Sequence, residues 1–409
     1  MPLTANGAIL LDLTRTVSRL GRGPLTGIDR VESAYLDHFL AADYPLFGLV
    51  RTPIGFLLLD HAGCAAISAR VHLNEPLGKS DLIGGLFHRN SPLRARADAD
   101  ARRFSIGRAA RPLLKRLLRH LPLGSVYFNV GHANLTMGCL TQIRHAGLGV
   151  VVMVHDTIPL DHPEFARLGT IAPFRQKLVA VARHADLVVH TTQDARTKTE
   201  HHFGHLGRVP RGVVANLGVP TPVANPAALP PGVNLLRPYF VAIGTIEPRK
   251  NYELLLNVWD QFGTGPDTPQ LFIIGARGWA SPELFARLDV LPADHPVKLM
   301  SNLPDAAVAA LLQNAAGLLF PSHAEGFGLP VVEAAATGVP VITSNLAVIK
   351  ELVGDYAVYL DATDVYSWME TIRQHAKDAM QPQNGQTEPR FCHQPPSWAD
   401  HFRTVLRNI

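Results

Sequence analysis

Cysteine is scarce in this chain, which excludes a fold held together by disulfides. Only three cysteines, Cys64, Cys139 and Cys392, occur among the 409 residues, and no two of them form a CxxC pair. Disulfide-rich secreted domains need cysteines that are dense and paired. The cysteine usage therefore favours a reducing cytoplasm.

Long hydrophobic runs are also missing. No stretch reaches the roughly 18 consecutive apolar residues from which a transmembrane helix is predicted. The first residues, MPLTANGAILLDLTRT, have no basic segment, and their apolar run is too short for a signal peptide. We therefore expect a cytoplasmic protein without a transmembrane helix.

The chain has little excess charge of either sign. Lys and Arg number 38 and Asp and Glu 34, which gives a net charge of +4. This mildly basic composition suits an acidic substrate, a phosphate-rich ligand or an anionic membrane surface, and does not choose between them. No basic patch is interleaved with aromatic residues, so we expect no nucleic-acid partner. The length predicts two domains of roughly 200 residues each.

Short apolar runs that alternate with helix-like segments are what the chain does contain. Such runs, rich in β-branched residues, are typical of parallel strands covered on both faces. We predict an α/β fold with two doubly wound, Rossmann-like sheets. The predicted strands are residues 8–13, 125–131, 150–156, 186–192, 239–245, 270–276, 317–322 and 339–344.

A proline-rich stretch, GVPTPVANPAALPPGVNLLRP (218–238), separates the two halves. It has little hydrophobic pattern, so we predict an interdomain linker there. The division gives a first domain over 1–222, a second domain over 236–385 and a terminal segment over 386–409.

The terminal segment is predicted to end in an amphipathic helix. A polar stretch, 381–396, precedes it, and Ser397 is a favourable N-cap residue. The apolar face of this helix comprises Trp398, Phe402, Val405 and Leu406.

The stretch ARRFSIGRAARPLLKRLLRHLP (101–122) combines basic residues with leucines. It is predicted either as a helix with a solvated basic face that packs on the domain, or as an interfacial helix drawn to anionic lipid. The second alternative would place the protein peripherally on the inner face of the cell membrane.

Two glutamates flank a glycine-rich turn in HAEGFGLPVVEAAATGVPVITS (323–344). The turn follows a predicted strand, and Pro330 suits the first position of a helix. The N–H groups of residues 326–329 then lie at a helix N-terminus, where they suit a phosphate or a ring of hydroxyls. Glu325 and Glu333 can accept hydrogen bonds from vicinal hydroxyls. Alternatively, Glu333 only complements the helix dipole and Glu325 faces solvent.

A second strand end carries adjacent cations. In YFVAIGTIEPRKN (239–251) a turn at Gly244 leads to Arg249 and Lys250. An arginine that grips two oxygens beside a lysine is typical of a pyrophosphate site. The alternative is an exposed helix start with two solvated basic residues.

EGFGLPVVEA and GTIEPRKN together resemble the donor site of retaining glycosyltransferases of family 4, which have the GT-B fold, and the resemblance is to mannosyltransferase-like members. The resemblance covers the second half of the chain. In the first half it is looser and rests on LTGIDRVE (25–32), VHDTIPLDHPEF (154–165) and the strand at 186–192.

The resemblance implies two Rossmann-like domains that face a central cleft, closed by a hinge, with the last helix packed back on the first domain. It implies transfer of a sugar from a nucleotide diphosphate with retention of configuration and without a bound metal or cofactor. Arg249 and Lys250 match the diphosphate pair, Glu333 the ribose ligand and Glu325 the acid at the donor sugar. The remaining donor-binding residues implied are Gly244, Gly326, Phe327, Gly328 and Leu329.

In the first domain the resemblance places His155 by the donor sugar, with its backbone carbonyl toward the anomeric carbon. His155 thus joins Glu325, Lys250 and Arg249 as a catalytic candidate, unless its ring is simply satisfied by loop hydrogen bonds. Asp156 orients His155 or the acceptor. No side-chain base is assigned, because the leaving phosphate oxygen can take the acceptor proton.

Three further positions are expected on the acceptor side: Gly27, Arg30 and His132. The pair Thr26–Gly27 can start a helix whose N-terminus faces the cleft. Arg30 either reaches an anionic acceptor group or forms a surface salt bridge.

No metal site is expected. DAD (98–100) fits a metal motif only formally, in a charged helical run, and EHHFGH (200–205) has no common ligand spacing and is predicted as a surface loop.

The sequence thus predicts a hexosyltransferase that moves a sugar, with a weak preference for mannose from GDP-mannose, to a glycan or lipid-linked acceptor in bacterial surface polysaccharide or lipopolysaccharide synthesis. Three rivals stay open. They are a nucleotide-sugar epimerase, a non-catalytic nucleotide-sugar-binding scaffold, and a dinucleotide-dependent oxidoreductase, for which LGRGPLTG is a poor GxGxxG match.

Overall fold

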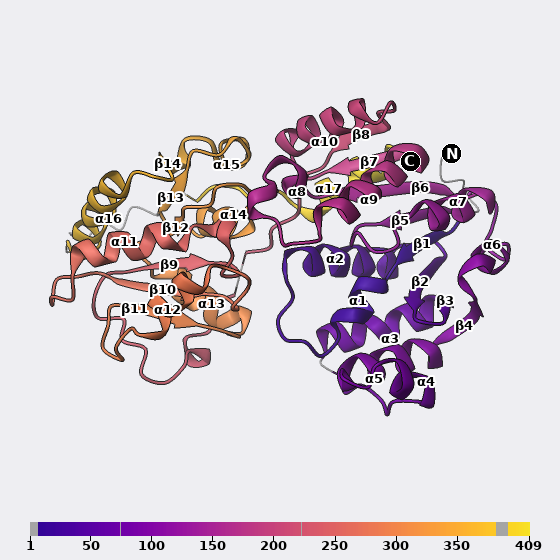
Figure 1. Cartoon of the computed structure of the whole chain (residues 1–409), viewed down its shortest axis with the longest axis horizontal. Coiled ribbons are helices and arrows are strands. Elements are labelled where there is room, and N and C mark those ends of the chain that lie inside the picture. Colours follow the sequence, from indigo (N-terminus) through magenta and orange to yellow (C-terminus); the bar gives the residue numbers. More distant parts are fainter. Residues whose placement is uncertain (1–6, 74, 222, 382–391) are drawn as a thin grey trace.

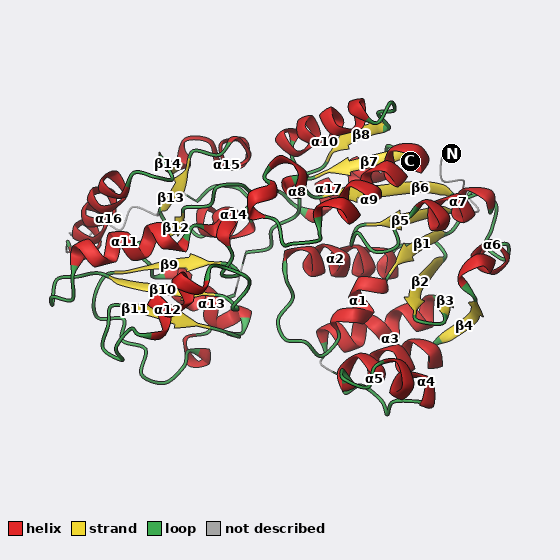
Figure 2. Cartoon of the chain, in the orientation of Figure 1, coloured by secondary structure: helices red, strands yellow, loops and turns green. Residues whose placement is uncertain are grey.

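The structure, a computed structural model, describes residues 7–73, 75–221, 223–381 and 392–409. It shows two α/β domains side by side (Figure 1), each with a central sheet between helices (Figure 2). Each of the eight predicted apolar runs contains a strand. The predicted arrangement of two Rossmann-like domains is confirmed.

In the first domain the described residues form an eight-stranded sheet of order β4-β3-β2-β1-β5-β6-β7-β8. The strands from β2 to β8 along this order pair in parallel, whereas β3 pairs antiparallel with both β2 and β4, an edge that the sequence did not predict. The bounds are β1 (Ile9–Asp12), β2 (Leu46–Thr52), β3 (Gly55–Leu59), β4 (Ser105–Ala109), β5 (Val126–Asn129), β6 (Gly149–Val154), β7 (Leu187–His190) and β8 (Arg211–Val214).

Helices cover both faces of this sheet. Ile9 and Leu11 of β1 pack into one core cluster and Leu10 into another, as alternation along a strand requires. The helices are α1 (Thr14–Arg19), α2 (Gly27–Ala41), α3 (His61–His72), α4 (Leu82–Phe87), α5 (Pro92–Arg103), α6 (Leu114–Leu118), α7 (Met137–His145), α8 (Ile158–Asp161), α9 (Ile171–His184) and α10 (Gln193–His205).

The second domain has, within its described part, a six-stranded sheet of order β11-β10-β9-β12-β13-β14 in which all pairs are parallel. Its strands are β9 (Tyr239–Ile243), β10 (Gln270–Ile274), β11 (Val297–Met300), β12 (Gly317–Phe320), β13 (Val341–Ser344) and β14 (Ala357–Leu360). Its helices are α11 (Tyr252–Phe262), α12 (Pro282–Asp289), α13 (Asp305–Gln313), α14 (Leu329–Ala336), α15 (Ala347–Val353) and α16 (Val365–Met380).

The last helix, α17 (Trp398–Leu406), lies within the first domain, as expected (yellow in Figure 1). The Ser397 side chain caps it by accepting from the Asp400 N–H. Phe402 stacks on His38 of α2 with 3.7 Å between ring centroids, and Val405 is fully buried. The last helix therefore ties the end of the chain to the first domain. Residues 382–391 of the polar stretch and the proposed boundaries at 222 and 385 lie outside the described residues.

The prediction of one basic helix over 101–122 is wrong. α5 ends at Arg103, β4 follows, and α6 begins only at Leu114. Leu114, Leu117 and Leu118 turn inward to the core of the first domain. The single interfacial helix of the second alternative is therefore not formed, because such a helix needs a continuous exposed apolar face, and peripheral membrane contact stays a prediction. No helix among the described residues has the length and apolar character to cross a membrane.

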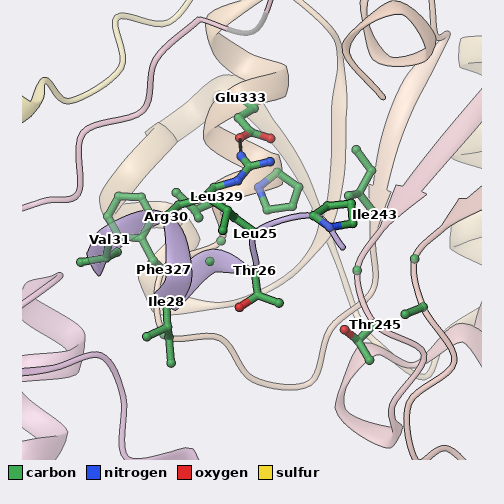
Figure 3. A pocket seen from close by; sticks show the side chains of 18 of the residues that line it. Leu25, Thr26, Ile28, Arg30, Val31, Ile243, Thr245, Phe327, Leu329 and Glu333 are labelled. Atoms are coloured by element: carbon green, nitrogen blue, oxygen red, sulfur yellow. Dashed lines mark hydrogen bonds and ion pairs between the residues drawn. The ribbon is translucent and has the colours of Figure 1, made fainter. Parts of the chain in front are cut away.

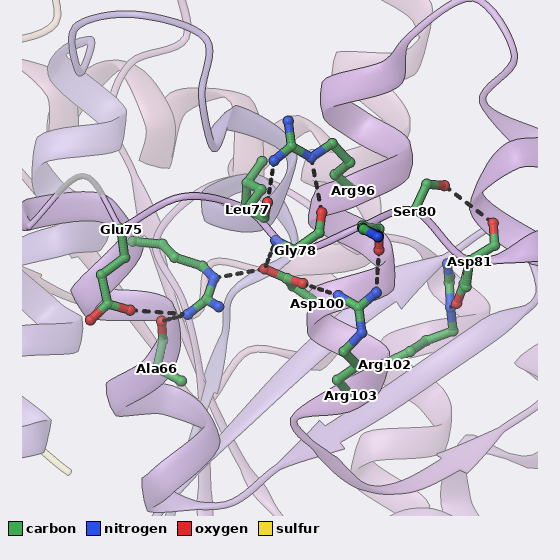
Figure 4. A network of polar contacts seen from close by, with 12 residues as sticks. Ala66, Glu75, Leu77, Gly78, Ser80, Asp81, Arg96, Asp100, Arg102 and Arg103 are labelled. Carbon is green, nitrogen blue, oxygen red and sulfur yellow. Dashed lines mark hydrogen bonds and ion pairs between the residues drawn. The ribbon is translucent and has the colours of Figure 1, made fainter.

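Both acids of DAD are held in ion pairs, and Figure 4 shows the contacts of Asp100. Asp98 lies 2.9 Å from the Arg94 guanidinium, and Asp100 lies 2.7 Å from that of Arg70. Both carboxylates are buried, so they neutralise arginines and hold α5 in place.

The prediction of a surface loop at 200–205 is also wrong, because α10 continues to His205. His202 Nε2 lies 2.6 Å from Asp161, which ties α10 to α8. Within the described ranges no cluster of three or more His, Cys, Asp or Glu side chains is arranged to hold a metal ion.

Candidate active site

A cavity of about 580 Å³ lies between the two domains, at the carboxyl ends of their strands. Thirteen of the predicted site residues line it, and His132 does not. From the first domain come Gly27, Arg30, His155 and Asp156, and from the second Gly244, Arg249, Lys250, Glu325, Gly326, Phe327, Gly328, Leu329 and Glu333.

Glu325 is the centre of a buried ion-pair cluster that follows β9 and β12. Its carboxylate lies 2.6 Å from Lys250 Nζ and 2.7 Å from the Arg249 guanidinium. Glu247 pairs with Arg249 at 2.6 Å. Burial acts to raise the pKa of Glu325, but Arg249 and Lys250 outweigh it and lower that pKa to about 2. Glu325 is therefore ionised at neutral pH.

These side chains are not solvated surface groups. The exposed fraction is 7% for the Glu325 side chain and 11% for that of Lys250. The alternatives of a solvent-facing acid and an exposed basic helix start are therefore wrong. Gly244, at φ +151°, leaves room for Lys250, because a Cβ there would lie 3.1 Å from its Cε.

The turn before α14 depends on Gly328. This residue is the N-cap at φ 93°, in the left-handed region that glycine tolerates. A Cβ at this position would lie 2.6 Å from Ile349. The helix therefore begins at Leu329, one residue earlier than predicted, and Pro330 lies in its first turn. Glu333 stands on the second turn and lines the cavity from a different height than Glu325.

Gly326 lies at a close contact between the backbones of the two domains. A Cβ added to it would lie 2.9 Å from the His155 carbonyl oxygen and 2.9 Å from the Asp156 Cβ. The Thr191 hydroxyl bridges the same contact, 3.1 Å from the Gly326 carbonyl oxygen and 3.2 Å from that of His155. The backbone of the EGFG turn thus packs against the end of β6.

The His155 ring is satisfied by the loop after β5. Its Nε2 lies 2.6 Å from the Val130 carbonyl, and burial lowers its pKa to about 4. The ring is therefore neutral at pH 7 and donates from Nε2. His132 makes the equivalent contact with the Met153 carbonyl at 3.0 Å, and the two rings are 5.0 Å apart. His132 thus supports His155 from behind the cavity.

Arg30 spans the two domains (Figure 3). From α2 it reaches Glu333 on α14 at 2.8 Å and Asp305 at the start of α13 at 2.9 Å. Burial raises the pKa of Glu333, and Arg30 counteracts this shift. Glu333, the predicted ribose ligand, is thus paired with an arginine of the opposite domain. Of the two alternatives for Arg30, the structure shows the salt bridge, and this salt bridge joins the two domains.

The N-terminus of α2 is built as expected. Thr26 is the N-cap, and Asp29 completes a capping box by accepting from the Thr26 N–H at 2.9 Å. Thr26 and Gly27 both line the cavity.

Sequence reasoning missed Thr191, Asp305 and the arginines Arg19 and Arg22, all of which line the cavity. Thr191 lies at the end of the predicted strand 186–192, directly after the observed β7, and a polar residue at a strand end is a usable signal. Asp305 follows a proline at a helix start, but nothing local indicates that it faces another domain.

Comparison with known proteins agrees with this geometry. Residues 231–387 match the family described as "Glycosyl transferases group 1". The matched region spans most of the second domain and contains both EGFGLPVVEA and GTIEPRKN.

Among curated relatives, the serotype-specific mannosyltransferase WbdA of Escherichia coli is 30% identical over 273 residues, which are 60% of this chain and 33% of WbdA. The O-antigen chain mannosyltransferase B of Escherichia coli is 34% identical over 142 residues, which are 34% of this chain and 37% of that protein. The chain thus spans about a third of the length of these relatives.

Among solved structures, Anabaena HepE in complex with UDP-glucose superimposes with a TM-score of 0.60, over 91% of this chain and 90% of HepE, at 16% identity. WaaG, described as a glycosyltransferase involved in lipopolysaccharide biosynthesis, gives a TM-score of 0.52 at 14% identity and covers 90% of both chains. At these identities the likeness concerns the fold, and it extends over both domains.

Proposed function

We propose that this protein is a retaining glycosyltransferase that moves a hexose from a nucleotide-diphosphate donor to a glycan or lipid-linked acceptor in bacterial surface polysaccharide synthesis. The observation that carries the proposal is the ion-pair cluster of Arg249, Lys250 and Glu325, which lines the interdomain cavity. Mannosyltransferase relatives and the matched family support the reaction class.

The donor is proposed to lie along the second domain. Arg249 and Lys250 bind the diphosphate, Glu333 accepts from the ribose hydroxyls and Glu325 accepts from hydroxyls of the sugar. Fixed cations stabilise the negative charge that develops on a departing diphosphate without reorganisation at the moment of reaction. Because Glu325 is already ionised, it holds both cations in position before the donor arrives.

The chemistry proposed is a substitution at the anomeric carbon. The bond from this carbon to the β-phosphate oxygen breaks, and its electron pair stays with the phosphate. The acceptor oxygen attacks from the same side, and its proton passes to the leaving phosphate oxygen. His155 is neutral and hydrogen-bonded through Nε2, so its proposed contribution is the backbone carbonyl, which lies against Gly326 at the cavity.

Mannose from GDP-mannose is the proposed donor, on the strength of the mannosyltransferase relatives. No metal or other cofactor is proposed, because Arg249 and Lys250 supply the positive charge that the diphosphate requires. A cytoplasmic location stays a prediction that rests on cysteine usage. Two alternative functions differ from this proposal in ways that can be measured. An epimerase would convert the donor without an acceptor, and a non-catalytic scaffold would bind the donor without turnover.

The test is a transfer assay with GDP-mannose and a mannoside acceptor, with Glu325→Gln compared with Glu283→Gln. Glu283 is an exposed glutamate in the same domain and serves as the matched control. We expect Glu325→Gln to reduce kcat at least about 100-fold, as the loss of one preorganised charge does in other enzymes, and Glu283→Gln to have no effect. Equal turnover by both variants contradicts the proposal, and donor conversion without an acceptor favours the epimerase.

A further inference from the structure

The Arg30 guanidinium joins two helices of the domain to which Arg30 itself does not belong. Its Nη1 lies 2.8 Å from Glu333 Oε1 on α14, and its Nη2 lies 2.9 Å from Asp305 Oδ1 on α13. Figure 3 shows the Arg30 side chain extended from α2 toward Glu333. Since both acids belong to the second domain, Arg30 makes these contacts only while the two domains are closed on each other.

The turn of α2 that carries Arg30 is held in place from both domains. Asp29 closes the capping box at the start of the helix by accepting from the Thr26 N–H at 2.9 Å. Gly27 packs against the first residue of α14, because a Cβ added to Gly27 would lie 3.4 Å from Leu329 Cδ1. The first turns of α2 and α14 therefore meet, and Arg30 reaches the second domain from a fixed backbone.

Glu333 stands in an environment that disfavours its negative charge. Its side chain is only 14% exposed. Burial is the largest influence and raises the pKa of Glu333, Arg30 acts against it, and Asp305 adds a further rise. An acid of this kind is protonated more readily when its cation is removed. The charge of Glu333 therefore depends on a residue of the opposite domain.

The charge matters because of the role proposed for Glu333. An ionised carboxylate only accepts hydrogen bonds, as the vicinal hydroxyls of a ribose require, whereas a protonated one has lost part of that capacity. Arg30 donates to Oε1, and among the described residues Oε2 of Glu333 accepts no hydrogen bond. Glu333 lines the interdomain cavity, so Oε2 is the oxygen left for a ribose hydroxyl.

We propose that Arg30 is a positioning residue for the donor: by closing onto Glu333 it holds that carboxylate in place as the ribose acceptor. The inference rests on the proposed function and adds a link between domain closure and recognition of the nucleoside. Arg249 and Lys250 belong to the second domain and are held there by Glu325, so the diphosphate contacts need no closure. The ribose contact, in contrast, becomes strong only in the closed protein.

The first experiment compares GDP with 2′,3′-dideoxy-GDP by calorimetry, because the two ligands differ only in the ribose hydroxyls. Arg30→Met keeps the length of the side chain and removes its charge. We expect it to weaken GDP at least about fivefold, as the loss of a partly buried charged partner does, and to leave dideoxy-GDP unchanged. The matched control is Arg287→Met, which removes an arginine 2.8 Å from Asp260 that is 36% exposed, against 37% for Arg30. If the wild type selects UDP, the uridine pair of ligands replaces the guanosine pair.

The pH dependence separates positioning from mere structural support. Both ligands carry the same diphosphate, so the ratio of their affinities reports the ribose contact alone. In Arg30→Met this ratio should fall at a higher pH than in the wild type, because Glu333 without its cation takes up a proton at a higher pH. Arg30→Lys restores a cation and should recover part of the ratio. Loss of a purely structural contact would change the affinities of both ligands equally at every pH.

The outcomes are separable from those of the proposed function. Equal weakening of GDP and dideoxy-GDP in Arg30→Met, or an unshifted pH profile, overturns the inference. If Glu333→Gln abolishes the preference for GDP over dideoxy-GDP and Arg30→Met retains it, the inference fails alone. If the wild type shows no such preference, the ribose role of Glu333 fails and the inference fails with it. If no nucleoside diphosphate binds, the donor site and the proposed function fail.

Discussion

The Glu325→Gln variant offers a quantitative test of the ion-pair cluster. Gln keeps the shape of the side chain and removes its charge, so Arg249 and Lys250 lose the carboxylate that lies 2.7 Å and 2.6 Å away. The pKa of Glu325 is about 2 in the folded protein against a reference of 4.5. Each unit of pKa shift corresponds to about 1.4 kcal/mol, so the ionised carboxylate contributes about 3 kcal/mol to stability at pH 7.

The sign of the pH dependence follows from the lowered pKa. The stabilisation is fully present above pH 4.5 and is lost as the pH falls toward 2, because the unfolded chain takes up a proton first. Linkage predicts that the stability gap between wild type and Glu325→Gln narrows by about 1.4 kcal/mol between pH 7 and pH 3.5.

The assay is urea unfolding followed by circular dichroism at both pH values, with Glu283→Gln as the exposed control. We expect a midpoint loss at pH 7 for Glu325→Gln, a smaller loss at pH 3.5, and no pH-dependent difference for Glu283→Gln. A gap for Glu325→Gln that is independent of pH refutes the reasoning, because a group that does not titrate across this range cannot have the shifted pKa.

Three further predictions concern the contacts between the parts of the chain. Gly326→Ala places a methyl group 2.9 Å from the His155 carbonyl oxygen, so it should push the domains apart and reduce transfer at least about tenfold while the melting temperature changes little. Arg30→Ala removes the bridge to Glu333 and should increase the radius of gyration measured by X-ray scattering without nucleotide, whereas an unchanged radius shows that other contacts hold the domains closed. Phe402→Ala removes a buried ring that joins the last helix to the first domain, and should cost about 3–5 kcal/mol in urea unfolding; a cost below about 1 kcal/mol shows that the last helix is not part of the core.

The parts of the fold that follow from local pattern were predictable. The parallel strands are runs of β-branched residues buried on both faces, such as VVVMV after Gly149, and a run of this kind has few other stable environments. The turn before α14 was also predictable, because a glycine-rich loop after a strand and a proline near the next helix start indicate where the helix begins, here to within one residue.

The first-domain edge was not predictable in the same way. β4 (SIGRA) lies between two helical segments and has only two apolar side chains, Ile106 and Ala109, so no apolar run marks it as a strand. The conformation of β4 is decided by its antiparallel partner β3, which is distant in the sequence. Ala109 of β4 pairs with Phe56 of β3. Tertiary pairing of this kind overrides local propensity.

The candidate site divides along the same line. Glu325, Arg249 and Lys250 were found because each sits in a recognisable strand-end motif. The pairing of Arg30 with Glu333 joins residues 303 positions apart in different domains, and no local signal reports it. The burial of Glu325 could not be predicted either. An acidic residue in a glycine-rich loop is expected to be exposed, and only the structure shows that Arg249 and Lys250 enclose it.

Calorimetric titration of GDP and UDP in the presence of EDTA tests whether Arg249 and Lys250 hold a nucleoside diphosphate between the domains without a divalent metal. We expect saturable binding of one of the two nucleotides, weakened at least about tenfold by Lys250→Ala, as loss of a charged hydrogen-bonded contact does. Lys377→Ala, which changes an exposed lysine of the same domain, should leave the binding unchanged. Absence of binding in EDTA, or equal affinity in Lys250→Ala and the wild type, would contradict the account.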